Sequence, residues 1–107
     1  MSNIYGKCAD KARNKIVAAA ACFPTDSSPA DRAELLAALE IMRGKIGTKK
    51  PYSFPEVAEP HRDIVAGFWN QTVAAYAFCQ ESQQHVVAVA IGQTLDRLAT
   101  LLERNSG

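Results

Sequence analysis

Apolar residues recur at steps of three and four through residues 60–104, the longest regular stretch of the chain. Such steps place side chains on one face of an α-helix, and neither glycine nor proline interrupts the run from Trp69 to Ile91. The stripes of the two halves of this stretch would lie about 100° apart on a single straight helix. We therefore predict two helices folded back on each other, with a break at 81–84, where Ser82 can cap the second helix. The alternative is one rod of about 65 Å that dimerises along its length.

Each of these two helices has one clearly apolar face. The first, expected over 60–81, would bury Ile64, Val65, Phe68, Thr72, Ala75, Tyr76 and Cys79. The second would bury Val87, Ile91, Thr94, Leu95, Leu98, Leu101 and Leu102. Trp69 and Phe78 lie on opposite flanks of the first stripe, so neither is expected at the centre of the core.

Two more helices are predicted in the first half of the chain. Residues 3–22 carry apolar side chains at helical spacing, and Pro24 ends this helix because the residue before a proline is pushed out of the α region. A second helix is expected over 29–46. Ser28 is suited to be its N-cap, and Gly47 is suited to close its carboxyl end.

Residues 48–59 form the one long irregular segment. Its prolines forbid a continuous helix, although a short helical turn is expected at 55–58 with Ser53 as its cap. Loops of this length either carry function or connect opposite ends of a bundle. Tyr52 and Phe54 are expected to pack at the edge of the core.

These elements predict an all-α fold, an irregular antiparallel four-helix bundle with a fifth short helical turn in the loop. The 107 residues fit a single domain, residues 1–107, and a composition of 48% hydrophobic and 21% charged residues is typical of globular proteins. No apolar run approaches the roughly 20 residues of a membrane-spanning helix. Charged residues interrupt the N-terminal segment where a signal peptide would be apolar, so we expect a cytoplasmic location.

Three cysteines, Cys8, Cys22 and Cys79, all lie within apolar helical patterns. An odd number of cysteines does not suggest a disulfide framework, and free cysteine is among the most buried residue types. We therefore expect three buried thiols in a reducing compartment.

Residues with catalytic or metal-binding chemistry are scarce. His61 and His85 are the only histidines, and the pair of Glu81 and His85 supplies two ligands where zinc requires three or four. Cys79 and His61 would lie about 27 Å apart on one helix, too far for a nucleophile and its base. No glycine-rich phosphate loop is present. We expect no catalytic residues, no metal, no cofactor and no enzymatic activity.

Basic residues gather in two places. Lys7, Lys11 and Lys15 follow each other at four-residue steps along one side of the first helix. The second cluster consists of Arg43, Lys45, Lys49 and Lys50, and the aromatic residue Tyr52 follows it. The net charge of only +1 gives no general attraction to nucleic acid, yet the first half of the chain is net positive and the second half net negative. A protein with this asymmetry can dock by one face.

Several apolar residues lie off the main stripes, namely Ile41, Val73, Val86 and Val89, and Trp69 is lateral. Exposed together they would form the kind of patch that marks a partner site, unless they fill a second layer of the bundle. Aromatic side chains dominate interface energetics. The candidate partner-binding residues are Lys7, Lys11, Lys15, Arg43, Lys45, Lys49, Lys50, Tyr52 and Trp69.

In its size, alanine-rich helical build and lack of a catalytic motif, the chain resembles the small all-helical inhibitors encoded by phages and mobile elements, including the anti-CRISPR proteins. The resemblance covers the general build, so no site residue is carried over. It implies stoichiometric binding to a large host complex, and we expect a protein-binding inhibitor or regulator that is a monomer rather than a homodimer. Two alternatives are a nucleic-acid-binding accessory protein that uses the two basic clusters, and a self-associating helical scaffold.

Overall fold

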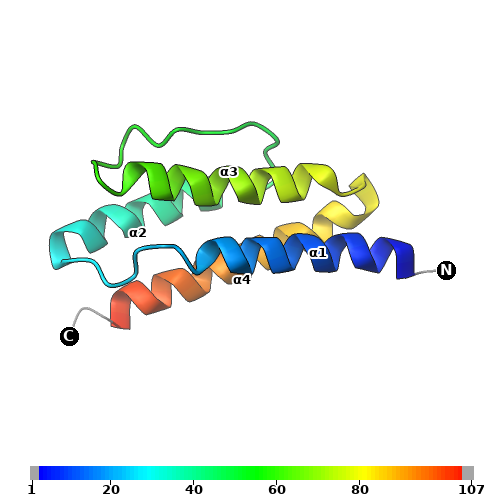
Figure 1. The fold of residues 1–107 in the computed structure, drawn as a ribbon, viewed down its shortest axis with the longest axis horizontal. Helices are drawn as coiled ribbons and strands as arrows, with labels where there is room; N and C mark the ends of the chain where they lie inside the picture. Colours follow the sequence, from blue (N-terminus) through cyan, green and yellow to red (C-terminus); the bar gives the residue numbers. More distant parts are fainter. Residues whose placement is uncertain (1–2, 105–107) are drawn as a thin grey trace.

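Four helices make up the fold in the computed structural model, which describes residues 3–104 and the side chains from residue 8 to residue 104 (Figure 1). They are α1 (Asn3–Ala20), α2 (Pro29–Gly44), α3 (Arg62–Phe78) and α4 (Glu81–Arg104). No strand occurs within the described residues. The expected all-α class is confirmed, and the described part of the chain is an elongated body of about 49 × 26 × 19 Å.

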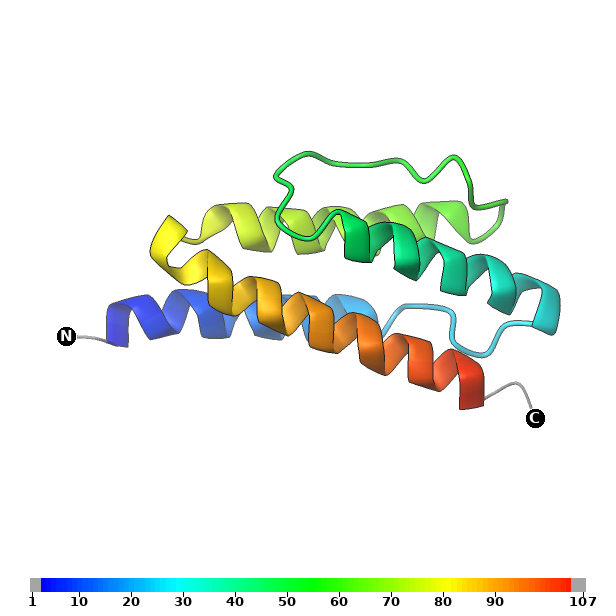
Figure 2. The ribbon, with the colours of Figure 1, turned by 180° about the vertical axis from the view of Figure 1, so that it is seen from behind.

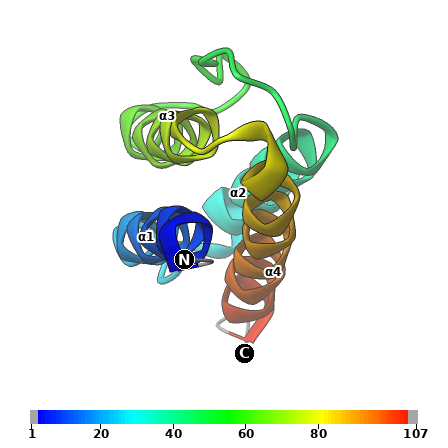
Figure 3. The same ribbon diagram turned by 90° about the vertical axis from the view of Figure 1, so that its right-hand side faces the viewer.

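The helices do not simply alternate in direction. Figures 1 and 2 show that α1 and α4 run one way along the body, while α2 and α3 run the other way. In the end-on view, α1 lies beside both α3 and α4 (Figure 3), and α2 packs against α4. The α1–α3, α2–α4 and α3–α4 pairs are thus antiparallel, whereas α1 and α4 are parallel neighbours.

The start of α2 follows the capping chemistry expected from the sequence. The Ser28 hydroxyl accepts a hydrogen bond from the backbone N–H of Asp31, and Pro29 occupies the first turn. At the other end, the backbone N–H of Lys45 donates to the last turn, and Gly47 adopts a φ of 100°. A positive φ favours glycine, which explains why the chain leaves the helix here.

The turn between α3 and α4 confirms two helices rather than one rod. The break lies at Cys79 and Gln80, slightly earlier than expected, so Ser82 sits inside the first turn of α4 instead of capping it. The buried side chain of Gln84 closes the turn, because its Nε2 donates to the carbonyl oxygens of Tyr76 and Cys79. The Tyr76 carbonyl also accepts from the backbone N–H of Cys79, so Gln84 adds a second donor there and supplies one to the Cys79 carbonyl.

The segment between α2 and α3 crosses from one end of the body to the other and lies over the gap between these helices (Figures 1 and 3). Phe54 and Val57 of this segment are fully buried. The backbone N–H of Tyr52 donates to Asn70 of α3, and that of Ala58 donates to Glu34 of α2. The expected helical turn at 55–58 is only a hydrogen-bonded turn. The segment therefore contributes side chains to the core together with the four helices.

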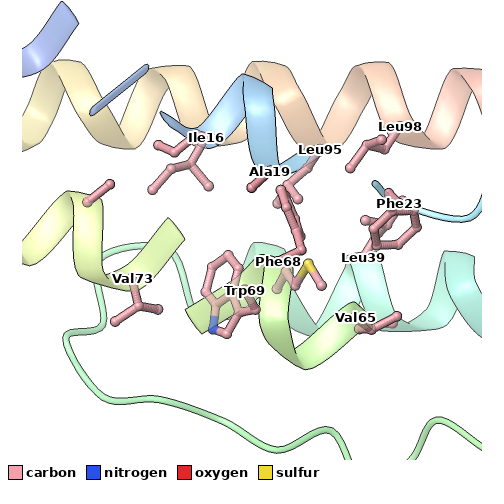
Figure 4. Close-up of a cluster of buried hydrophobic side chains, with 14 of the residues drawn as sticks. Ile16, Ala19, Phe23, Leu39, Val65, Phe68, Trp69, Val73, Leu95 and Leu98 are labelled. Atoms are coloured by element: carbon pink, nitrogen blue, oxygen red, sulfur yellow. The ribbon is translucent and has the colours of Figure 1, made fainter. Parts of the chain in front are cut away.

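Figure 4 shows the centre of that core, where Ile16, Leu39 and Leu95 from three helices meet Phe68 and Trp69 of α3. Trp69 is only 1% exposed, so the expectation that this lateral side chain is a partner contact is wrong. Val73, expected off the stripe, is buried as well. The physical reason is the crossing segment, which covers the flank of α3 that a bare four-helix packing would leave open.

The cysteines differ from expectation. Cys8 of α1 and Cys79 after α3 form a disulfide, with their Cα atoms 5.8 Å apart, and Cys22 is free and exposed. The prediction of three buried thiols is therefore wrong. Helical spacing places each cysteine on an apolar face, but it cannot show that the antiparallel pairing of α1 and α3 brings two of those faces together.

Candidate functional site

A groove of about 470 Å³ runs between α1 and α3. Two of the sequence-predicted residues, Lys11 and Lys15, stand on its α1 side and are exposed. The remaining lining is mostly small and apolar and consists of Cys8, Ala12, Ala18, Gln71, Ala74, Ala75 and Phe78. No ion pair within the described residues involves either lysine. Their charges are therefore available to a bound molecule.

Phe78 is the most exposed large apolar side chain of the described residues, at 82%. It is the last residue of α3, and the next residue, Cys79, turns inward to the disulfide. At about 100° per residue, Phe78 lies about 60° around α3 from the buried Ala75, at the edge of the buried face, and the chain leaves the helix directly after it. The sequence pattern places Phe78 on a flank of α3, but only its position beside the groove makes it a candidate contact residue.

Three exposed residues of α3 are spaced seven residues apart. Ile64, Gln71 and Phe78 are seven residues apart, which places them on one side of the helix. Ile64 is 44% exposed although it was expected in the core. An exposed isoleucine and an exposed phenylalanine thus mark two ends of one helical face.

The groove is held in shape from both ends of the α1–α3 pair. The Cys8–Cys79 disulfide joins the two helices next to Phe78. Farther along, the rings of Phe23 and Phe68 meet edge to face with centroids 5.7 Å apart. A surface that is already ordered loses less conformational entropy when a partner binds.

The second basic cluster is largely used within the protein. Arg43 forms ion pairs with Asp96 of α4 and with Glu40, and the hydrogen bond to Asp96 raises the pKa of Arg43. The Lys45 ammonium lies 4.0 Å from the centroid of the Tyr52 ring. These contacts hold the end of α2 in place and reduce the cluster's capacity to bind a ligand.

Tyr52 is engaged on its polar side too. Its hydroxyl donates a hydrogen bond to the Glu56 carboxylate, which lowers the pKa of Glu56 and raises the pKa of Tyr52. Only Lys49 and Lys50 of the second cluster are exposed without an ion pair among the described residues. Trp69 lies in the core and cannot serve as a surface contact, and the side chain of Lys7 lies outside the described residues.

A second groove, of about 340 Å³, lies between α1 and α4. Arg13 and Arg97 line it together with Val17, and Arg13 pairs with Asp10 at 3.7 Å. Val86, expected off the stripe, is about half exposed on α4. This surface carries branched aliphatic side chains but no aromatic one, so it is a weaker candidate for an interface and a useful control.

Metal-binding residues do not cluster in the described part of the chain. Within it, no three His, Cys, Asp or Glu residues lie close enough to hold a metal ion. His61 lies at the start of α3 with its Nε2 3.3 Å from Asp31 Oδ2, a contact that joins α2 to α3. None of the described helices has the length and apolarity needed to span a membrane.

Comparison with known proteins gives no relatives. No family model matches the chain, and neither the curated proteins nor the solved structures include a significant match. Function therefore has to be inferred from the grooves and the exposed side chains.

Proposed function

We propose that this protein is a non-enzymatic regulator that binds another protein through the groove between α1 and α3. The observation that carries the proposal is the exposed ring of Phe78 beside a groove lined by two unpaired lysines. Leaving an aromatic ring in water costs free energy that burial in an interface recovers. Aromatic side chains of this kind dominate binding energy in protein interfaces.

In its narrower form, the proposal is that the protein inhibits a host effector complex by stoichiometric binding, as the anti-CRISPR proteins do. The general build supports this form, since a small helical body with a preformed groove needs no catalytic group to block a surface. A monomer is the expected state, because two identical grooves offer lysines to each other but no Asp or Glu to pair with them.

Affinity capture from the native host tests the general proposal. Tagged wild-type protein is compared with Phe78→Ser, and Val86→Ser, at an exposed position of α4 outside the α1–α3 groove lining, serves as the matched control. Both replaced side chains are exposed, so neither change disturbs the core. We expect a specific partner with wild type and Val86→Ser that is lost with Phe78→Ser. Equal recovery with all three proteins would place the interface elsewhere.

An interference assay tests the narrower form. Cells with an active CRISPR system are challenged with a targeted phage or plasmid while they express the wild-type chain or Phe78→Ser. We expect wild type to restore infection or transformation and Phe78→Ser to fail. Restoration by neither protein across the systems of the native host would reject this form and leave protein binding as such untouched.

The cellular compartment in which the protein acts is related to the redox state of Cys8 and Cys79. Structural disulfides persist in oxidising compartments and are rare in the cytosol. A cytoplasmic site of action therefore favours reduced Cys8 and Cys79 in the cell, whereas the bonded pair fits an oxidising compartment. Trapping thiols in intact cells with an alkylating reagent, followed by mass spectrometry of the two cysteine peptides, separates these outcomes.

Nucleic-acid binding is supported less well than protein binding. Arg43 and Lys45 are occupied by Asp96 and Tyr52, which leaves Lys49 and Lys50 as the exposed cations of that cluster. Under this alternative, oligonucleotide affinity would fall steeply between low and physiological salt, and Lys49→Glu with Lys50→Glu would abolish it. Absence of binding at low salt removes the alternative.

A further inference from the structure

We infer that the occupant of the groove between α1 and α3 is an amphipathic helix of a partner protein, with carboxylates along one edge of its apolar stripe. This inference rests on the proposed protein-binding function and specifies the partner. It follows from the shape of the groove, from the placing of its two lysines and from the exposed residues of α3.

The shape fits a helix. Two antiparallel helices, α1 and α3, form the walls, and a third helix can lie along the furrow between two packed helices. The lining residues run from Cys8 to Ala18 on α1 and from Gln71 to Phe78 on α3, which is about 15 Å and about 11 Å at 1.5 Å per residue. A partner helix of about three turns covers that length.

The lysines set the charge of the partner. Lys11 and Lys15 are one helical turn apart on the same side of α1, about 6 Å along the axis. Carboxylates three or four residues apart on a facing helix have the same spacing. Since neither lysine is paired within the described residues, an acidic edge on the partner gains two new ion pairs.

The apolar contacts set the pattern of the partner. Phe78 shares the groove with alanine side chains, among them Ala18 and Ala74, whose small size lets a second helix approach closely. The ring of Phe78 needs a pocket between partner side chains at i, i+3, i+4 and i+7. The expected partner segment therefore has an apolar heptad stripe with Asp or Glu beside it.

Two other occupants fit the groove poorly. In a symmetric dimer formed by this face, Lys11 and Lys15 would find no carboxylate in the groove of the second copy, because its lining contains no Asp or Glu. A nucleic acid would find two exposed lysines above an alanine-rich lining, and methyl groups make no favourable contact with phosphates.

A peptide-display selection tests the inference. Oxidised wild-type protein is the bait for a library of about 20-residue peptides with a fixed apolar heptad stripe and randomised flanking positions. The same library is selected against Lys11→Glu with Lys15→Glu, against Phe78→Ser, and against Val86→Ser as control. Affinities of the enriched peptides are measured by fluorescence anisotropy at physiological salt.

We expect wild type and Val86→Ser to enrich Asp and Glu at flanking positions three or four apart. The charge-reversed protein should enrich Lys and Arg at those positions instead. Phe78→Ser should weaken binding of the enriched peptides at least about 30-fold, the loss typical of removing an interface anchor.

Enrichment without acidic bias, or binding that Phe78→Ser leaves unchanged, would overturn the inference. Two further measurements address the other occupants. A concentration-dependent increase in mass that Phe78→Ser abolishes would assign the groove to a second copy of the chain, and oligonucleotide binding lost on charge reversal would assign it to nucleic acid. If a host partner needs Phe78 but the peptides show no acidic preference, only this inference fails and the proposed function stands.

Discussion

Two phenylalanines of this chain show how strongly burial decides what a side chain contributes to the stability of the fold. Phe54 of the crossing segment is fully buried and is the only non-glycine residue with positive φ among those described, whereas Phe78 is 82% exposed. A buried ring stabilises the fold even where the backbone conformation is unfavourable. An exposed ring stabilises nothing in the free protein.

The first prediction compares the same change at both positions. Phe54→Ala should lower the free energy of unfolding by about 3–5 kcal/mol, because it removes a core ring and leaves a cavity. Phe78→Ala should change it by no more than about 0.5 kcal/mol, since the side chain is on the surface. Urea denaturation followed by circular dichroism measures both. Similar losses for the two variants would contradict the assigned burial.

The second prediction concerns Tyr52 and Glu56, which are joined by a hydrogen bond that lowers the pKa of Glu56. Tyr52→Phe removes this hydrogen bond, so the pKa of Glu56 should rise towards its ordinary value. A carboxylate with a lowered pKa in the folded state contributes stability above its unfolded pKa and loses it as the pH falls through the folded pKa. In Tyr52→Phe, the part of the folding stability that this hydrogen bond provides above the unfolded pKa of Glu56, and that is lost as the pH falls, should therefore be absent.

An NMR pH titration of the Glu56 side chain measures the shift directly. Tyr76→Phe is the control, since its ring lies on α3 and no hydrogen bond to Glu56 involves it. An unchanged Glu56 pKa in Tyr52→Phe would mean that the hydrogen bond does not form in solution.

At the scale of elements, the turn between α3 and α4 depends on a side chain that the hydrophobic pattern does not mark. Gln84 is polar yet buried, and it donates to two carbonyl oxygens at the end of α3. Helix ends leave carbonyls short of partners, and a buried amide that donates to two successive ones, at Tyr76 and Cys79, fixes the direction in which the chain continues.

The third prediction is that Gln84→Ala lowers the free energy of unfolding by about 1–3 kcal/mol, because the buried carbonyl oxygen of Cys79 loses the Gln84 donor and that of Tyr76 keeps only the backbone N–H of Cys79. Gln93→Ala, at an exposed position of the same helix, should have an effect within about 0.5 kcal/mol. Thermal unfolding of both variants tests this. An equal effect for the two would show that α4 propensity, and not the cap, matters at position 84.

The crossing segment is the other element with a structural task. Its hydrogen bonds to Asn70 and Glu34 attach it to α3 and α2, whose backbones make little close contact with each other. Phe54 and Val57 fill the space between these helices. A long connection of this kind is what allows α2 and α3 to run in the same direction.

At the scale of the whole molecule, the Cys8–Cys79 disulfide joins positions 71 residues apart. A cross-link over so long a loop removes many conformations from the unfolded chain. It also holds α1 against α3 beside Phe78, so the fold and the candidate groove depend on the same bond.

The fourth prediction is that replacing Cys8 and Cys79 with serine lowers the free energy of unfolding by about 4 kcal/mol, the loop-closure value for this separation. Cys22→Ser should leave stability unchanged, because this cysteine is free and exposed. Urea denaturation with and without reductant measures both. If reductant does not destabilise Cys22→Ser, the disulfide is not formed in solution.

The sequence by itself determined the four helices, the capped start of α2 and the break between α3 and α4. These features follow from interactions within a few residues, such as the Ser28 cap, the prolines and the apolar periodicity. Even buried threonines in the stripes are explained locally, since Thr72 and Thr94 donate to the carbonyl oxygens of Phe68 and Ala90 one turn earlier.

Only the tertiary structure decided which flanks of those helices are covered. The crossing segment buries Trp69, the pairing of α1 with α3 joins Cys8 to Cys79, and the ion pair with Asp96 occupies Arg43. All three depend on residues distant in sequence, and the order of residues along a helix contains no information about which helix becomes its neighbour. The groove beside Phe78 arises in the same way, because it belongs to neither α1 nor α3 alone.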